Sequence, residues 1–162
     1  MFFVYQILLT ILLFTSPIFI LFRILKNKEH KKRFVEKFSI TSKQRKRGNL
    51  IWFHGASVGE ILSIIPLVKF YEKKNKIHQI LITSSTLSSS KVIQKFKFKK
   101  TIHQFFPIDH FFFINKFLNH WKPNLAIFIE SEVWPYMFKK LYNRKISLIL
   151  LNARLTKKTF NR

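Results

Sequence analysis

Short apolar runs alternate with longer amphipathic segments along residues 49–151. The short runs predict β-strands at residues 49–53, 79–84, 101–106, 125–129 and 147–151. The segments between them carry apolar side chains at helical spacing and predict helices near residues 58–74, 88–98, 112–120 and 134–142. Strands that alternate with helices are typical of a parallel sheet covered on both faces. With right-handed crossovers, the pattern therefore predicts an α/β fold with a Rossmann-like parallel sheet.

The N-terminal stretch, residues 1–22, contains no charged side chain. As a helix it would extend about 33 Å, close to the thickness of the hydrocarbon core of a bilayer. Basic residues follow on its C-terminal side, so the positive-inside rule predicts a single membrane anchor with the rest of the chain in the cytoplasm. Pro17 and four polar side chains leave two alternatives open, an interfacial helix in one leaflet and a buried core helix.

Residues 23–48 are strongly basic, and we interpret them as a linker between the anchor and a folded domain at residues 49–162. Such a stretch attracts anionic lipid headgroups by about 1 kcal/mol per well-placed Lys or Arg, and a solvated linker is the alternative. The whole chain has 162 residues, a net charge of +23, seven acidic residues and no Cys. The charge favours an anionic partner, whereas the absence of Cys excludes a disulfide framework.

The Phe and Lys content would suit single-stranded nucleic acid, but no RNA-binding signature is present and the expected anchor argues against such a partner. AT-rich coding DNA would explain the abundance of Lys, although it does not explain the scarcity of acidic residues. An anionic membrane surface or a phosphorylated substrate is therefore the preferred interpretation.

The run His54-Gly-Ala-Ser-Val-Gly-Glu60 follows the first predicted strand. Ser57 and Glu60 have the spacing of a capping box, in which each residue satisfies a free N–H at a helix start. The alternative interpretation makes Glu60 a general base at the carboxyl edge of the sheet, where a turn containing Gly59 lets a substrate approach. The two glycines of this run complete neither a dinucleotide-binding fingerprint nor a P-loop.

Two of the seven acidic residues, Glu130 and Glu132, follow the fourth predicted strand. A helix start would account for one of them, but a carboxylate here could also stabilise positive charge that develops on a sugar ring. Arg154 follows the fifth predicted strand, where it could bind a phosphate or carboxylate, or be an ordinary surface arginine. No pair of His residues has metal-ligand spacing, so we expect no metal site and expect His54 and His103 to be buried or capping residues.

Taken together, these motifs resemble the N-terminal half of the 3-deoxy-D-manno-octulosonic acid (Kdo) transferase family. The resemblance rests on the order of the anchor, the basic stretch and five further runs: Lys32-Arg-Phe34, Ile65-Pro-Leu-Val68, Phe106-Pro-Ile-Asp109, Glu130-Ser-Glu-Val-Trp-Pro135 and Asn152-Ala-Arg-Leu155, with the Glu60 run between the first two. Each motif is weak alone, and the set covers almost the whole chain.

The resemblance implies a B-type glycosyltransferase that moves Kdo from CMP-Kdo to the lipid A precursor of lipopolysaccharide, with inversion and with neither a metal nor a cofactor. It implies that Glu60 is the proton acceptor and Glu130 the transition-state stabiliser, with Ser57, Gly59, Glu132 and Arg154 in supporting or acceptor-binding roles. It places the enzyme at the inner membrane with a cytoplasmic catalytic domain. Family members are longer, so we expect residues 49–162 to be an incomplete acceptor-side domain, without its C-terminal donor domain and inactive alone. A non-catalytic module that binds anionic glycolipid or a partner protein is the alternative.

Overall fold

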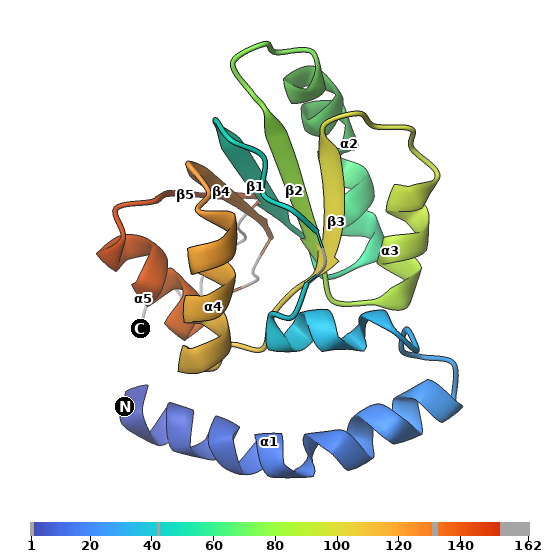
Figure 1. Cartoon of the computed structure of the whole chain (residues 1–162), viewed down its shortest axis with the longest axis vertical. Coiled ribbons are helices and arrows are strands. Elements are labelled where there is room, and N and C mark those ends of the chain that lie inside the picture. The colour runs from blue at the N-terminus through green and yellow to red at the C-terminus, as the bar shows by residue number, and fades with distance from the viewer. Residues whose placement is uncertain (1, 42, 131–132, 153–162) are drawn as a thin grey trace.

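The computed structural model describes residues 2–41, 43–130 and 133–152, and it contains one parallel sheet with helices on both faces (Figure 1). The strands are β1 (Leu50–His54), β2 (Gln79–Ser84), β3 (Thr101–Phe105), β4 (Leu125–Ile129) and β5 (Ser147–Leu151), in the sheet order β3-β2-β1-β4-β5. The helices that follow the strands are α2 (Val58–Glu72), α3 (Leu87–Gln94), α4 (Phe111–Trp121) and α5 (Pro135–Asn143). The predicted Rossmann-like sheet is confirmed.

Alternate residues of the central strands enter two separate cores. Trp52 of β1 points to the α4–α5 face, where its ring packs 4.9 Å from Phe117 and 5.0 Å from Phe128, measured between ring centroids. Phe53, the next residue, points to the α2–α3 face and joins Ile64 there. Because both faces are covered, β1 is buried along its whole length, which explains why the four residues before His54 form an apolar run.

The N-terminal helix, α1 (Phe2–Leu25), lies along the carboxyl edge of the sheet (Figure 1). Its docked side uses polar groups. The Tyr5 hydroxyl donates to Asp109 Oδ2 at 2.9 Å. Gln6 Nε2 donates to the carbonyl oxygen of Asp109 at 3.2 Å, and Gln6 Oε1 accepts the N–H of Phe111 at 3.0 Å. Thr10 Oγ1 lies 3.2 Å from the His110 ring.

Among the described residues, no helix combines the length and the apolarity that crossing a bilayer requires. The membrane-spanning helix expected at residues 1–22 is therefore not found in the structure. In the structure, Gln6 and Thr10 of α1 instead make hydrogen-bond contacts with Asp109 and His110 of the domain.

Part of the stretch that we expected to be a linker is packed against the sheet. Residues Arg33–Phe38 form a 3-10 helix, η1, in which the Arg33 guanidinium bonds to both oxygens of Glu36 at 2.8 and 2.9 Å. Glu36 is buried, and its Oε2 accepts the N–H of Phe105 at 2.9 Å. Arg33 also donates to Nδ1 of the buried His103 at 2.9 Å. This network joins η1 to the end of β3.

The contacts of His103 favour its neutral form. Its Nδ1 accepts from Arg33, so Nε2 carries the proton that faces Ser84 Oγ at 2.8 Å. Burial, followed by the positive charges of Arg33 and Lys43, holds the pKa of His103 well below 6.5.

Because the pKa of His103 is lowered by folding, the unfolded chain binds more protons than the native chain below about pH 6.5. We therefore expect the free energy of unfolding to fall as the pH drops from 6.5 towards the native pKa. His103→Gln should make this pH dependence shallower by up to about one proton, measured by urea denaturation from pH 7 to pH 5. The exposed His78→Gln serves as the control, and an unchanged slope in His103→Gln would show that this ring does not couple to folding.

Candidate active site

The sheet order reverses at β1 and β4. The chain moves outward from β1 to β2 and β3 on one side, and through β4 to β5 on the other. In open α/β sheets, ligands bind in the crevice at the carboxyl ends of the two strands where the order reverses. His54, the last residue of β1, pairs with Phe128 of β4. Glu60 and Glu130 belong to the segments that follow these two strands, so the topology assigns both to the carboxyl edge of the sheet.

Glu60 is held by the turn between β1 and α2. Ser57 is the N-cap of α2, and its Oγ accepts the N–H of Glu60 at 3.2 Å. The Glu60 Oε2 accepts the N–H of Ala56 at 2.8 Å, and the residue is only 8% exposed. The capping interpretation of Ser57 is confirmed, although Glu60 reaches back to Ala56 rather than to Ser57. The second oxygen of Glu60, Oε1, makes no hydrogen bond with the described residues.

Gly55 lets Glu60 fold back over the turn. A Cβ at this position would lie 3.0 Å from the Cβ of Glu60, closer than real side chains normally pack. Gly59 has open space around it, with Ser57 Oγ 4.0 Å from an ideal Cβ, and both Gly59 and Ser57 are exposed. The turn thus has one close-packed glycine beneath the carboxylate and one open glycine, Gly59, at the surface.

Glu130 differs from every other acidic side chain in the described residues. Five carboxylates accept hydrogen bonds within the protein: Glu29, Glu36, Glu60, Glu72 and Asp109. Glu130 is exposed and makes no side-chain hydrogen bond or ion pair with the described residues. Its backbone has φ 59°, a left-handed conformation that is unfavourable for a residue with a Cβ. Strain of this kind at a strand end is typical of a residue kept for function rather than for stability.

Replacing Glu130 with glycine is expected to raise the free energy of unfolding by about 0.5–1 kcal/mol, because glycine adopts the left-handed conformation without a steric cost. Glu130→Ala keeps the Cβ and should show no such gain. Urea denaturation of the two variants checks the difference. If alanine and glycine stabilise the chain equally, backbone strain is not the cause.

A cavity of about 220 Å³ lies at this edge of the sheet, between α1 and the loops that follow β2 and β3. It is lined by Tyr5, Leu9, Lys37, Ser85, Trp134 and the run Phe106–Asp109. The Trp134 ring packs 4.9 Å from Phe106, and the Phe106 ring stacks 3.9 Å from His54. The aromatic wall and the hydroxyl and ammonium groups together suit a ligand with both apolar and polar faces, such as a sugar.

Asp109 is a structural member of the site that the sequence did not single out for a role of its own. Its carboxylate accepts the N–H groups of Tyr136 and Met137 at 2.9 and 2.7 Å and thereby caps the start of α5. Burial raises the pKa of Asp109, whereas these hydrogen bonds and that from Tyr5 act in the opposite direction. The signal available in the sequence was the place of Asp109 after the Phe-Pro-Ile run, which lies between β3 and α4.

The remaining predicted residues have different outcomes. Glu132 and Arg154 lie outside the residues that the structure describes, so their roles stay predictions. His54 and His103 are buried, as expected, and His54 Nδ1 lies 2.9 Å from Thr83 Oγ1. Within the described ranges, no group of three or more His, Asp and Glu side chains could hold a metal ion.

Comparison with known proteins points to one family. A family model described as 3-deoxy-D-manno-octulosonic-acid transferase (kdotransferase) matches residues 32–162. The chain is similar to the probable mitochondrial 3-deoxy-D-manno-octulosonic acid transferase of Arabidopsis thaliana, with 37% identity over 99% of this chain and 36% of that protein. It is also similar to the 3-deoxy-D-manno-octulosonic acid transferases of Rickettsia bellii (40% identity, 88% of this chain, 34% of that protein) and Haemophilus influenzae (32% identity, 69% and 26%). The chain thus spans about a third or less of the length of these curated relatives.

Proposed function

The chain belongs to the 3-deoxy-D-manno-octulosonic acid transferase family, and from this premise we propose that it forms the acceptor-side, base-bearing part of an inverting Kdo transferase. The observation that carries the proposal is the position of Glu60 and Glu130 after β1 and β4, the two strands that flank the crevice. In this proposal the donor is CMP-Kdo, the acceptor is the lipid A precursor, and the reaction needs no metal or cofactor. The family resemblance supports these substrates and a second domain that binds the donor nucleotide.

In the proposed reaction, a hydroxyl oxygen of the acceptor attacks the anomeric carbon of Kdo from the face opposite the leaving group. The new C–O bond forms as the bond to CMP breaks, CMP leaves with the electron pair, and the configuration inverts. Glu60 Oε1 accepts the hydroxyl proton. Glu130 offers its unpaired carboxylate to the positive charge that develops on the sugar ring.

The fixed turn prepares Glu60 for this role. One oxygen is engaged by the Ala56 N–H, which sets the orientation of the carboxylate before a substrate arrives. Positioning of this kind lowers the barrier because the base does not have to be ordered during the reaction. Ser57 supports the arrangement by capping the helix on which Glu60 lies.

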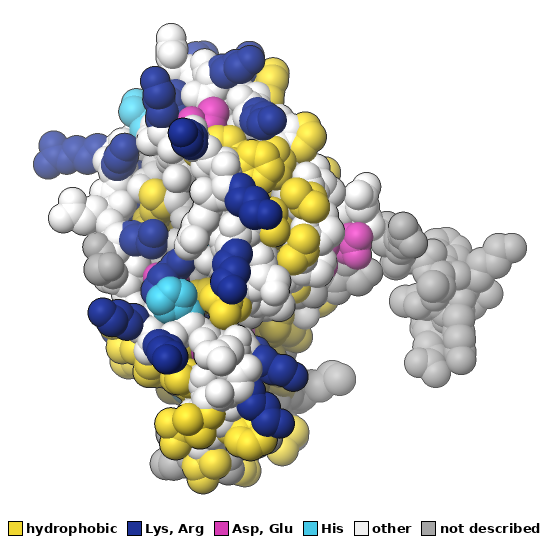
Figure 2. All heavy atoms as spheres, turned by 90° about the vertical axis from the view of Figure 1, so that its right-hand side faces the viewer, with side chains coloured by type: hydrophobic (Ala, Val, Ile, Leu, Met, Phe, Trp, Pro, Cys, Tyr) yellow, Lys and Arg dark blue, Asp and Glu magenta, His cyan; other side chains and the backbone are white. Residues whose placement is uncertain are grey.

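We further propose that α1 lies in the plane of the inner membrane, with the catalytic domain in the cytoplasm. The side of α1 opposite its docked face exposes large apolar residues at helical spacing: Ile7, Leu8, Ile11, Ile18, Leu21, Phe22 and Leu25. An apolar stripe on a helix whose other face is held by protein fits burial in one leaflet. The face shown in Figure 2 carries many Lys and Arg side chains and few acidic ones, which favours an anionic surface as the partner.

Flotation with vesicles that contain anionic phospholipid tests the location. The wild-type chain is expected to float with the vesicles. The combined variant Leu8→Ser/Ile18→Ser/Leu25→Ser is expected to bind at least roughly tenfold more weakly, because it removes the three most exposed large apolar side chains of α1. The control Leu62→Ser/Phe70→Ser changes exposed apolar residues of α2 and should float normally. Equal flotation of both variants would exclude α1 as the lipid-binding element.

The transferase proposal is tested with a chimera in which residues 32–152 replace the matching segment of the Rickettsia bellii relative. The chimera is expected to transfer Kdo to a lipid A precursor in a purified assay. A chain that only binds glycolipid would give a chimera that binds the acceptor without transferring the sugar, and this result would favour the non-catalytic alternative.

A further inference from the structure

A hollow of about 650 Å³ lies on the outer side of α4, away from the crevice between β1 and β4. One wall is the segment of residues 39–41, and the other is α4. We call this hollow the α4 groove, and it is lined by Ser39, Ile40, Thr41, Phe111, Phe112, Asn115, Lys116, Asn119 and His120. It shares no lining residue with the cavity beside Trp134. The α4 groove is therefore a separate hollow, and the proposed transfer reaction does not account for it.

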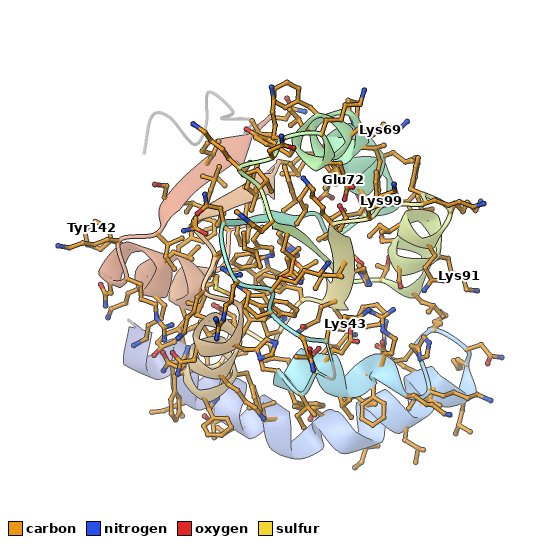
Figure 3. All side chains as sticks on the ribbon, turned by 45° about the horizontal axis from the view of Figure 1, so that its top comes forward. Lys43, Lys69, Glu72, Lys91, Lys99 and Tyr142 are labelled. Atoms are coloured by element: carbon orange, nitrogen blue, oxygen red, sulfur yellow. The ribbon has the colours of Figure 1, made fainter. Side chains whose placement is uncertain are left out.

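The two walls of the α4 groove are fixed to each other by hydrogen bonds. Ser39 Oγ donates to the Phe113 carbonyl at 2.7 Å near one end. At the other end, His120 Nε2 lies 2.9 Å from the carbonyl oxygen of Lys43, which follows that segment in the chain and is labelled in Figure 3. Arg45 Nε donates to the Trp121 carbonyl at 2.6 Å just beyond it. These bonds keep the walls in place without a ligand, so the groove is pre-formed.

The lining of the groove is apolar inside and polar at the rim. Ile40, Phe111 and Phe112 are 52%, 48% and 57% exposed, an unusual concentration of large apolar side chains around one hollow. Lys116 and Asn119 are exposed at the edge. A hydrocarbon chain would cover the apolar side chains, and the ammonium group of Lys116 would stay free for an anionic headgroup.

The end of the groove at Phe111 adjoins α1. The Gln6 Oε1 accepts the N–H of Phe111 at 3.0 Å, which places the first turn of α4 against the N-terminal part of α1. The exposed residues Ile7, Leu8 and Ile11 belong to this part of α1. The groove and the N-terminal part of α1, which carries these apolar residues, are therefore close to each other.

We propose that the α4 groove holds one acyl chain of an anionic phospholipid taken from the leaflet in which α1 lies. The inference rests on the proposed membrane location and adds a specific lipid site to it. The occupant is a lipid of the surrounding leaflet rather than the acceptor substrate, because neither Glu60 nor Glu130 lines the groove. The bound lipid would hold α4 and α1 at a constant depth relative to the membrane surface.

The test uses a single-chain alkyl phosphate that carries a photoreactive diazirine at the chain end, kept below its micellar concentration and mixed with the full chain. After illumination, the labelled peptides are identified by mass spectrometry. We expect labelling in residues 39–41 and 111–120. Phe112→Ser should reduce it roughly tenfold by removing apolar contact, and Asn119→Trp should reduce it by filling the hollow. Phe70→Ser is the matched control, because Phe70 is 52% exposed and lies on α2.

Labelling that is spread over the chain, or that Phe112→Ser and Asn119→Trp leave unchanged, would overturn the proposal. Competition by a soluble lipid A precursor, but not by a single-chain phospholipid, would assign the groove to the acceptor and would also overturn it. The membrane location is judged separately by vesicle flotation. Flotation without groove labelling contradicts the lipid site alone, whereas groove labelling without flotation contradicts the membrane location and, with it, the leaflet as the source of the lipid.

Discussion

Replacing Glu36 with alanine is expected to lower the free energy of unfolding by about 3–5 kcal/mol, the usual cost of removing one partner from a buried ion pair. The side chain of Glu36 is 6% exposed and that of Arg33 is 20% exposed, so the guanidinium would lose its partner where water can replace it only in part. The N–H of Phe105 would also lose its acceptor at the end of β3. Thermal and urea denaturation measure the loss.

Glu36→Gln is the matched control for this prediction. The glutamine keeps the shape of the side chain and one acceptor oxygen for Phe105 or Arg33, so it should cost clearly less than alanine. A loss below about 1 kcal/mol for Glu36→Ala would mean that η1 is dispensable for the fold. In that case, residues 23–48 would behave as the solvated linker that their basic composition suggested.

Glu60→Gln, made in the chimera with the Rickettsia bellii relative, is expected to lower the rate of Kdo transfer by about 10²–10⁴-fold. Glutamine keeps an oxygen that can accept the Ala56 N–H, so the turn should survive, but an amide cannot take a proton from the acceptor hydroxyl. The effect should fall on kcat while KM for the acceptor changes little, because the lost interaction acts in the transition state.

Glu72→Gln is the control for the chemistry. Glu72 ends the same helix, and its carboxylate accepts the N–H groups of Lys99 and Lys100 at 3.1 and 2.9 Å. Figure 3 shows Glu72 and Lys99 near each other, on the side of the sheet away from α1. Its replacement should leave the rate of transfer within a few-fold of the parent. A similar loss in Glu60→Gln and Glu72→Gln would point to damage of α2 rather than to loss of a base.

The sheet was predictable from the sequence because the strands are covered on both faces. In β1, consecutive residues enter opposite cores, so the pattern is a plain apolar run bounded by turn residues. The predicted strand at 125–129 coincides with β4, and β3 ends one residue before its predicted end at 106. Helix ends were less exact. The helix predicted at 88–98 ends at Gln94 as α3, because Phe96 and Phe98 leave the helix and stack on each other.

The structure of the basic N-terminal stretch was not predictable in the same way. Glu36 and Arg33 stand in a run of Lys and Arg that has the composition of a solvated linker. Their partners His103 and Phe105 lie about 70 residues further along the chain. The spacing of apolar and polar residues near Arg33 and Glu36 does not predict contacts over such a distance. The scarcity of acidic residues was the usable signal. In a chain with seven acids, each acid is a candidate for a specific contact, and Glu36 makes one.

The candidate site was predictable in its position but not in its detail. The carboxyl ends of parallel strands meet at one edge, so the sequence could assign Glu60 and Glu130 to that edge, and their closeness stays a prediction. It could not give the left-handed backbone of Glu130, or the Asp109 contacts that join α1 and α5 beside the crevice. These features depend on how the loops pack in three dimensions, which hydrophobic periodicity does not encode.

The most direct test of the account is the ratio of Kdo transfer rates between the Glu60→Gln and Glu72→Gln chimeras, measured at saturating acceptor and donor. The expected ratio of the Glu60→Gln rate to the Glu72→Gln rate is about 0.01 or lower. Circular dichroism and urea denaturation should show that both variants are folded. A ratio near one would show that Glu60 only caps its helix, and the assignment of proton transfer to this chain would then be wrong.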